Sequence, residues 1–361
     1  MSAYQVDATL LAIASHKPKH LVLCYTEKDD IVAENCKNIQ EQASVLGLES
    51  IIPIPTSIEG AFLDSLLPDP EDNATITVNI TPGSKGQGAE LTLWAQEHGC
   101  IVWSIDNARR ICVPINRRED IFPIPIQSLD PRLIFRCKGQ SILEEGIDAN
   151  EMPDKEFAIG ILKCMRTAVK LHKEKHLFRA PLTLNDMKLT PNTQKGSWTL
   201  LCKGHSYSFS TRDGEWLERV TAMALLQIGA KYSRARMRLR WSQKNEEDIK
   251  RVHSDELGER QPHRLDLDVV GILKNDMILI SCKAITGKGS SVEEINAAAK
   301  EVRCMGTSLG RFCLRMLMHM GCTTPYIYEN SVMVFGWKEL CQPELLRGLI
   351  KTLRKKKSTS A

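Results

Sequence analysis

The sequence predicts an α/β protein built from two domains. Its 361 residues exceed what one hydrophobic core usually covers, so more than one domain is expected. The first 106 residues alternate short β-branched runs with amphipathic stretches, an order typical of a parallel sheet covered by helices. Beyond residue 195, a helical pattern precedes two strand-like runs joined by a short polar turn. These three observations predict an α/β domain in the first part of the chain and a helix followed by a hairpin in the second.

The composition is that of an ordinary folded protein, with 42% hydrophobic and 25% charged residues. No apolar run approaches the ~18 residues needed to cross a bilayer, and the start of the chain lacks a basic region ahead of an apolar core. We therefore expect a cytoplasmic protein with no membrane partner. The 12 cysteines form no CxxC pair and often stand within apolar runs, which favours reduced, buried thiols over disulfides or a zinc site.

The net charge of +4 is divided unevenly along the chain. Residues 1 to 120 hold 9 Lys and Arg against 17 Asp and Glu, a net −8, which leaves 39 against 27, a net +12, for the remainder. A polyanion would be repelled by the first part and attracted by the second, so a nucleic acid is the expected partner of residues 121 to 361. A drift of surface charge without function is the alternative.

The first part of the chain provides four strand-like runs in order, with helical patterns between them. The strands are expected at residues 20–25, 51–54, 74–80 and 101–105, and the helical patterns after the first strand up to about residue 46, at 58–67 and from about 87 onward. This is the pattern of a Rossmann-like domain, which we place at residues 1–125. A run rich in proline follows at 122–131, and residues 126–195 are expected to form a connector with a helix at about 155–172.

A short polar loop follows the third of these strands and opens a helix. It contains Thr81, Gly83, Ser84 and Lys85. Amide groups at the helix start, two hydroxyls and an ammonium group suit a phosphodiester at the carboxyl end of a strand. The loop matches neither GxGxxG nor GxxxxGK[ST], so neither a nicotinamide dinucleotide nor a magnesium nucleoside triphosphate is implied. A turn that merely joins strand to helix is the alternative.

Two strand-like runs between residues 263 and 284 form a predicted hairpin. With Asn275 and Asp276 as its two loop residues, Asp268 faces Lys283 and a hydroxyl lies on the same face. A three-residue loop would place Asp268 and Lys283 on opposite faces, so the register is the open point. The expected polar face carries Asp268, Ser281 and Lys283, and the expected apolar face carries Leu267, Val269, Ile280 and Cys282.

A helix with an apolar stripe is predicted just upstream, with Asp213 as its N-cap. Glu215 lies in the first turn, where complementing the helix dipole explains it. Glu218 lies beside the stripe, where a carboxylate near Asp268 would cost free energy unless a cation were present. The pair suits Mg²⁺ or Mn²⁺. The stripe comprises Leu217, Val220, Ala224, Leu225 and Ile228.

Four segments in this order resemble a known family. Gly214-x-Trp216-Leu217-Glu218, Leu267-Asp268-Val269 and Ile280-Ser281-Cys282-Lys283 look like the core of the PD-(D/E)xK nucleases. With the Thr81 to Lys85 loop upstream, residues 20 to 305 resemble the CARF-domain nucleases of type III CRISPR defence. The resemblance implies a Rossmann-like CARF domain at residues 1–125 that senses cyclic oligoadenylate. It also implies a restriction-endonuclease-like domain at residues 196–361.

The resemblance also assigns roles to residues of this chain. It implies that Glu218 and Asp268 hold the metal and that Lys283 positions the attacking water and stabilises the pentacovalent phosphate. It adds Thr26, at the end of the first strand, to Thr81, Gly83, Ser84 and Lys85 as a contact of the cyclic oligoadenylate. The chain departs from the family at Ser281, where an acidic residue usually stands, so one carboxylate ligand of the metal is missing.

Two further segments are candidates for nucleic-acid contact. Residues 232–241 alternate strictly, with arginines on one strand face and apolar side chains on the other. This arginine face, Arg234, Arg236, Arg238 and Arg240, suits a track for a phosphate backbone, or else an edge strand protected by charge. A helix predicted at 291–305 carries Asn296 and Lys300, and Lys300 is either a site residue or a solvated lysine.

We therefore expect a homodimeric, metal-dependent endonuclease activated by a cyclic oligoadenylate and acting on DNA, RNA or both. The ring is nearly two-fold symmetric, which favours a receptor made from two copies of one chain. Two alternatives stay open. One is a non-catalytic sensor of cyclic oligoadenylate, made plausible by Ser281. The other is a nuclease-like repair protein, in which the Thr81 to Lys85 loop is only a connector.

Overall fold

The computed structural model describes residues 6–26, 30–56, 75–106, 109–117, 121–124, 130–151, 160, 182–184, 187–192, 197–202, 204–210, 214–240, 264–284, 291–309 and 313–359. The chain divides into two compact units. Unit 1 comprises residues 1–142, 240–264 and 307–313, and unit 2 comprises residues 143–239, 265–306 and 314–361. The division into 1–125, 126–195 and 196–361 stays a prediction, and the helix predicted at 155–172 lies, apart from Gly160, outside the described residues.

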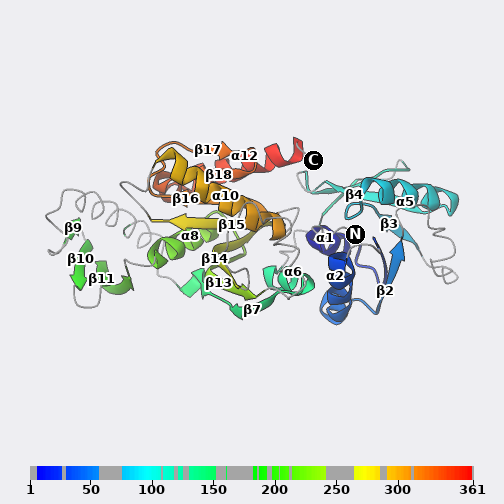
Figure 1. Ribbon diagram of the computed structural model, residues 1–361, viewed down its shortest axis with the longest axis horizontal. Helices are drawn as coiled ribbons and strands as arrows, with labels where there is room; N and C mark the ends of the chain where they lie inside the picture. Colours follow the sequence, from blue (N-terminus) through cyan, green and yellow to red (C-terminus); the bar gives the residue numbers. More distant parts are fainter. Residues whose placement is uncertain are drawn as a thin grey trace. The chain divides into compact units, whose positions relative to one another are not determined.

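Unit 1 is a mixed α/β structure (Figure 1). Along the chain, a helix lies between the two strands of each parallel pair. Strands β1 and β2 pair in parallel from His20↔Ser50 to Thr26↔Thr56, and β3 pairs in parallel with β4. Strands β5 and β6 extend the second sheet in antiparallel fashion. The elements are α1 (Val6–His16), β1 (His20–Thr26), α2 (Asp30–Glu41), α3 (Ala43–Leu46), β2 (Ser50–Thr56), β3 (Thr77–Asn79), α5 (Lys85–Glu97), β4 (Ile101–Asp106), β5 (Ile111–Pro114), β6 (Phe122–Pro123) and α6 (Pro131–Cys137).

Three of the predicted strands of the first part are confirmed, and the third, predicted at 74–80, is shorter and spans Thr77–Asn79. The helices after the first and third strands are also confirmed. The helix predicted at 58–67 lies outside the described residues. The sequence patterns did not reveal α1, whose residues are buried almost all round rather than along one stripe, because a helix enclosed in a core lacks polar periodicity. Asp130 caps α6 by accepting a hydrogen bond from the Arg132 amide at 2.9 Å.

Unit 2 is organised around an eight-stranded mixed sheet. Its strand order is β17-β18-β16-β15-β14-β13-β7, and β8 also pairs with β13. The elements of the sheet and its helices are β7 (Ser141–Glu144), β8 (Ile147–Asp148), the 3-10 turn η1 (Ala149–Glu151), α8 (Glu215–Gln227), β13 (Tyr232–Arg240), β14 (Arg264–Leu273), β15 (Asp276–Lys283), α10 (Val292–Leu309), β16 (Leu314–His319), β17 (Tyr326–Tyr328), β18 (Val332–Phe335), α11 (Trp337–Cys341) and α12 (Pro343–Thr359).

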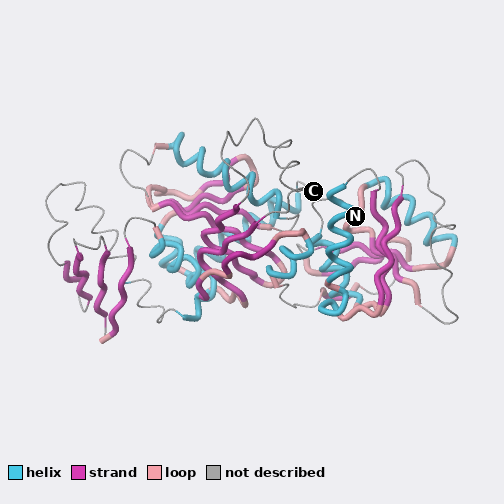
Figure 2. The backbone as a smooth tube through the Cα atoms, turned by 60° about the horizontal axis from the view of Figure 1, so that its bottom comes forward, coloured by secondary structure: helices cyan, strands magenta, loops and turns pink. Residues whose placement is uncertain are grey.

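Helices cover both faces of this sheet (Figure 2). On one face, α8 and α12 pack against strand residues such as Ile280 and Met316. On the other face, α10 packs against Leu317 and Val334. A separate four-stranded antiparallel sheet in the order β12-β11-β10-β9 precedes α8, formed by β9 (Leu182–Leu184), β10 (Met187–Asn192), β11 (Ser197–Cys202) and β12 (His205–Ser210).

The predicted apolar stripe of α8 is confirmed, since all five of its residues are buried. The predicted N-cap is wrong: the helix begins at Glu215, and Gly214 occupies the N-cap with a φ of 72°. Glycine adopts this left-handed conformation without the steric cost of a Cβ atom, which a sequence reading focused on polar capping residues does not detect. Asp213 lies outside the described residues.

The predicted hairpin is present, but its register differs from the prediction. Leu273 pairs with Asp276, so the two loop residues are Lys274 and Asn275. The shift moves each partner by two positions, which preserves the faces but places Asp268 opposite Ser281 instead of Lys283. Asp276 is drawn into the strand by Arg354 of α12, whose Nε donates to Asp276 Oδ2 at 2.7 Å.

Cysteines in the described ranges are free thiols, as predicted from their spacing. Among the described residues, no helix is both long enough and apolar enough to span a membrane.

Candidate functional site

The Thr81 to Lys85 loop forms one wall of a cavity in unit 1. The loop ends at Ser84, which caps α5: Ser84 Oγ accepts from the Gln87 amide at 3.2 Å, and Gln87 Oε1 accepts from the Ser84 amide at 3.2 Å. This capping box fixes where the helix starts and leaves the amides of its first turn beside the cavity. The cavity has a volume of about 640 Å³, and α5 lies along β3 and β4 beside it (Figure 1).

Four of the five predicted ring contacts meet in this cavity. Its lining residues are Ile80, Thr81, Gly83, Ser84, Lys85, Gly88, Ala89, Thr92, Leu93, Gln96, Ser104 and Ile105. Thr26 ends β1, where it pairs with Thr56, and its side chain lies outside what the structure describes. The lining combines an exposed ammonium group, hydroxyls and amides with small and apolar side chains, a mixture that suits a phosphorylated ligand with an apolar portion.

The sequence analysis missed the α5 wall of the cavity. Leu93 is 62% exposed although it is large and apolar, and Gln96 lies one turn further along the helix. A signal was available: Gly86 and Gly88 stand in the first turns of α5, where glycine is unfavourable, and no steric contact requires glycine at Gly86. Of the two, Gly88 lines the cavity.

In unit 2, Asp268 is held by the hairpin itself. Ser281 Oγ donates to Asp268 Oδ2 at 2.9 Å, and the Cys282 amide donates to the same oxygen at 2.7 Å. Two donors on Oδ2 orient the carboxylate. Ser281 is buried, so this hydrogen bond is shielded from water. The serine that replaces the expected acidic residue thus positions Asp268.

Glu218 lies on α8 in a cluster with arginines. It is 8% exposed, and its Oε2 lies 3.6 Å from Arg236 Nε. Arg236 Nη1 donates to Glu215 Oε2 at 2.8 Å, and Glu215 also pairs with Arg219. The sequence analysis assigned Arg236 to a track for nucleic acid. In the structure it neutralises the two α8 carboxylates.

Cys282 lies near both candidate metal ligands. Burial raises the pKa of its thiol well above the ordinary value, and the charges of Asp268 and then Glu218 raise it further. The charge of Lys283 lowers it by less. The charges of both candidate metal ligands thus act on this one thiol.

Lys283 ends β15 and has partners that the sequence analysis did not name. Its Nζ lies 3.8 Å from Glu301 Oε2 on α10. Lys283 also pairs with His319 across the parallel β15–β16 ladder, which places both side chains on one face of the sheet. His319 is buried, and its Nδ1 accepts from the Gly321 amide at 3.0 Å. These contacts join segments far apart in the sequence, so no local pattern reveals them.

The arginine face of β13 exists as predicted: Ala235, Met237 and Leu239 are buried and the arginines point away from them. Most of its charge is compensated. Arg234 Nη2 lies 3.4 Å from Asp148, and Arg238 pairs with Glu144 and lies 3.1 Å from Asp266. Arg240 is exposed at the strand end. A role of this face in nucleic-acid binding stays a prediction.

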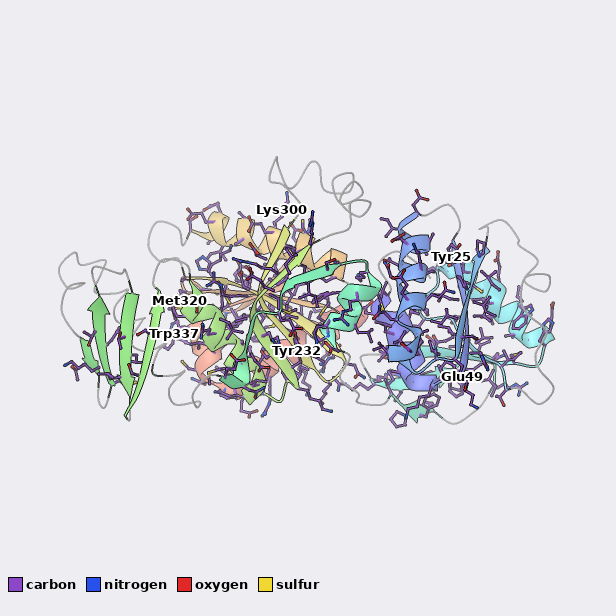
Figure 3. All side chains as sticks on the ribbon, turned by 90° about the horizontal axis from the view of Figure 1, so that it is seen from below. Tyr25, Glu49, Tyr232, Lys300, Met320 and Trp337 are labelled. Carbon is purple, nitrogen blue, oxygen red and sulfur yellow. The ribbon has the colours of Figure 1, made fainter. Side chains whose placement is uncertain are left out.

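The helix predicted after the lysine strand is α10, and it begins with a second capping box between Ser291 and Glu294. Asn296 accepts a hydrogen bond from the Tyr326 hydroxyl at 2.8 Å, which gives it a structural contact. Lys300 lies on the same helix, half-buried (Figure 3). Its assignment to the site stays a prediction.

The donor atoms suit a hard divalent cation better than a soft one. Asp268 Oδ1 is not engaged by the donors that hold Oδ2, and Glu218 offers carboxylate oxygens. Mg²⁺ is commonly bound by one or two carboxylates together with water and substrate phosphate. Within the described ranges, no group of three or more His, Cys, Asp or Glu side chains could hold a metal. Asp268 and Glu218 are the carboxylates that could hold such an ion.

Comparison with solved structures places this architecture among known proteins. Can2 from Sulfobacillus thermosulfidooxidans, solved with cyclic tetra-adenylate, matches with a TM-score of 0.61 and 15% identity over 98% of this chain and 97% of Can2. The chain shares the fold of Can2. Protein VC1899 from Vibrio cholerae matches with a TM-score of 0.56 and 11% identity over 99% of this chain and 97% of its own. No protein-family model and no curated protein matches the sequence.

A third solved structure has the same fold over part of its length. It is a DNA nuclease of type III CRISPR defence, activated by cyclic oligoadenylate. The match has a TM-score of 0.54 and 12% identity, and it covers 92% of this chain but 46% of that nuclease. The fold shared with Can2 therefore extends over nearly the whole chain, including both the cavity of unit 1 and the hairpin of unit 2.

Proposed function

We propose that this protein is a metal-dependent endonuclease of CRISPR defence that a cyclic oligoadenylate activates. Cyclic tetra-adenylate is the proposed activator, since it is the ligand of Can2. One observation carries the proposal: a chain with the fold of Can2 places Thr81, Gly83, Ser84 and Lys85 around one cavity and holds Asp268 in a hydrogen-bonded hairpin. The proposed architecture is a CARF-type domain followed by a PD-(D/E)xK-type domain.

The proposed chemistry is hydrolysis of a phosphodiester. Mg²⁺ or Mn²⁺ held by Glu218 and Asp268 would supply polarisation of a water molecule and of the scissile phosphate. Ser281 and the Cys282 amide keep Asp268 oriented, so that Oδ1 stays available. Lys283 brings a positive charge to the same sheet face, where it stabilises the charge that develops on the phosphate. The substrate is a DNA or RNA backbone.

The proposed activator binds between two copies of the chain. A cyclic tetra-adenylate is nearly two-fold symmetric, so each subunit of a homodimer would offer the same cavity. The net −8 of residues 1 to 120 repels a polyanion in general, so local donors have to bind the ring: Lys85, the α5 amides and the loop hydroxyls. Thr26 is included as a contact on the resemblance alone.

A cleavage assay tests the proposal. Supercoiled DNA, single-stranded DNA and RNA are each incubated with the protein, with Mn²⁺, Mg²⁺ or EDTA, and with or without a panel of cyclic oligoadenylates. We expect cleavage that requires both a divalent metal and one ring size. Cleavage that is independent of every ring would support the repair-nuclease alternative, and the absence of cleavage together with tight ring binding would support a sensor.

A non-catalytic sensor is the second candidate, and specific contacts favour it. Ser281 stands where a metal-binding carboxylate is expected, and Arg236 already supplies a positive charge 3.6 Å from Glu218. Because the charge of Glu218 is already balanced by Arg236, the site would bind a divalent ion weakly. Isothermal titration with Mn²⁺ separates the two candidates. A nuclease should bind Mn²⁺ and lose that binding in Asp268→Asn, whereas a sensor should show no Mn²⁺ binding that depends on Asp268.

A further inference from the structure

A chain of hydrogen bonds beneath the cavity loop connects the end of α1 to Thr81. The Thr81 amide donates to Asn79 Oδ1 at 3.0 Å, and Asn79 Nδ2 lies 2.9 Å from His16 Nε2. Thr81 is also fixed from its other side, because the Ile105 amide donates to Thr81 Oγ1 at 2.7 Å. All of these groups belong to unit 1, and Thr81 and Ile105 line the cavity.

The direction of each hydrogen bond follows from the chemistry of the donors. A backbone amide only donates, so the atom of Asn79 that faces Thr81 has to be the oxygen. The Asn79 NH₂ group then faces His16, and NH₂ only donates, so His16 Nε2 has to accept. An accepting Nε2 carries no proton. The geometry therefore requires the neutral imidazole with its proton on Nδ1.

The surroundings of His16 favour this neutral form. The ring packs against Trp103 at 6.0 Å and edge-on against Phe122 at 5.7 Å between centroids. Burial lowers the pKa of His16 below its ordinary value. Titratable groups on neighbouring elements are the buried Cys112 thiol on β5, Asp106 at the end of β4, which contacts Arg109, and the exposed Lys17, which follows His16. None of them is a partner of the ring in the described contacts.

Protonation of His16 would break this arrangement. The imidazolium ring carries N–H groups on both nitrogens, so Nε2–H would face the Asn79 NH₂ group, donor against donor. Asn79 relieves the conflict by turning its oxygen to His16, and this rotation takes the acceptor away from the Thr81 amide. The loop would then lose the hydrogen bond between the Thr81 amide and Asn79.

We propose that His16 is a positioning residue of the cavity, which holds the Thr81 loop in its ligand-binding conformation through Asn79 only while the imidazole is neutral. This inference rests on the proposed function, because it names the ring-binding loop as the group that is positioned. Because burial lowers the pKa of His16 below its ordinary value, affinity for the ring is full at neutral pH and falls as the pH drops through that lowered pKa.

The test is the dissociation constant of cyclic tetra-adenylate, measured with full-length protein between about pH 5 and pH 8. His16→Gln keeps an acceptor near the position of Nε2 but cannot titrate, so its affinity should match wild type at neutral pH and lose the acid-induced fall. His16→Phe keeps the aromatic packing but leaves the Asn79 NH₂ group unpaired, so it should bind roughly threefold to tenfold more weakly across the range. His98→Gln, which removes the histidine at the C-cap of α5 outside the cavity lining, should keep the wild-type profile.

A second readout does not depend on the ring. NMR titration gives the pKa of His16, identified by the resonance that His16→Gln removes. Asn79→Asp replaces the donating NH₂ group with an accepting carboxylate oxygen, so we expect the pKa of His16 to rise in that variant. An unchanged pKa would mean that the two side chains are not in contact in solution.

The outcomes separate this inference from the proposed function. If the wild type binds no cyclic oligoadenylate at any pH, the proposed function fails and the positioning role fails with it. If the wild type binds the ring but His16→Gln shows the same acid-induced fall, the positioning role alone is wrong. An unchanged pKa of His16 in Asn79→Asp would also overturn it.

Discussion

The contact between Ser281 and Asp268 changes the role that the sequence suggests for Ser281. The resemblance to the PD-(D/E)xK nucleases makes Ser281 a missing carboxylate ligand. The structure instead gives it a donor role, because its hydroxyl and the Cys282 amide both bind Asp268 Oδ2. No local pattern predicts this contact, since it depends on a register two positions away from the one that the turn residues suggest. Asp268, once oriented, presents a single oxygen to a cation.

The first prediction at this scale concerns the charge of Asp268. In Asp268→Asn the oxygen can keep its two donors, but an NH₂ group replaces the oxygen that faces the metal, so cleavage should fall by at least about a hundredfold. Lys283→Gln should cause a comparable loss by removing the positive charge near the phosphate. Cleavage rates under saturating activator measure both effects. Lys351→Gln, an exposed lysine on α12, serves as the control and should cleave like wild type.

The second prediction concerns the hydroxyl of Ser281. Ser281→Ala removes one of two hydrogen bonds from Asp268, and one such bond is worth about 1 kcal/mol, so cleavage should slow by roughly threefold to tenfold. Ser281→Thr keeps a hydroxyl and should restore most of the rate. Rates and apparent affinity for Mn²⁺ are measured for both variants. Equal rates in wild type and Ser281→Ala would show that the Cys282 amide alone suffices to orient Asp268.

At the scale of elements, sequence periodicity predicts which faces of a strand or helix are buried. It does not predict features that depend on contacts with residues far away in the chain, such as the hairpin register. Alternation revealed the buried and arginine-bearing faces of β13, and the apolar stripe revealed α8. The hairpin turn was misplaced because Asn275 and Asp276 are ordinary turn residues, whereas Lys274 adopts a φ of 62° that lysine seldom takes. Asp276 leaves the turn to pair with Arg354, 78 residues away.

The arginines of β13 also acquire partners from other elements. Arg236 has a φ of 59° within its strand, and the backbone there passes close to Gly146, where a Cβ atom would lie 2.2 Å from the Ala235 carbonyl oxygen. This kink accompanies the contacts of Arg236 with Glu215 and Glu218. A side chain bound to two carboxylates is already satisfied, so the arginine face carries less free positive charge than its sequence suggests.

The third prediction uses this compensation. Arg234→Gln combined with Arg238→Gln removes two arginines that are paired with carboxylates, so the dependence of substrate binding on salt should stay unchanged. Arg240→Gln removes an exposed arginine and should reduce the slope of log affinity against log salt by about 0.7 for a single-stranded substrate. Binding of labelled oligonucleotide is measured over a series of salt concentrations. A flatter slope in the double variant would restore the arginine face as a phosphate track.

At the scale of the whole molecule, two chemically different sites lie in two compact units of one chain. The acidic first part carries the cavity, and the basic remainder carries the hairpin, so the charge division of the sequence follows the division of tasks that we propose. Binding of a ring can raise nuclease activity only if the active arrangement of a dimer binds the ring more tightly than the resting one. Sequence patterns cannot give this difference in ring affinity, because it is a difference between the active and the resting arrangement of a dimer.

The last prediction tests that coupling through Lys85, whose exposed ammonium group lies at the cavity wall. Lys85→Ala removes a charge-assisted contact with the ring, so the concentration of cyclic tetra-adenylate that gives half-maximal cleavage should rise by about tenfold. The hairpin is untouched, so cleavage at saturating ring should remain near wild type. Lys37→Ala, an exposed lysine on α2 outside the cavity, should leave the activation curve in place. A lower maximal rate in Lys85→Ala would mean that Lys85 stabilises the active arrangement itself, and an unchanged curve would mean that the ring binds elsewhere.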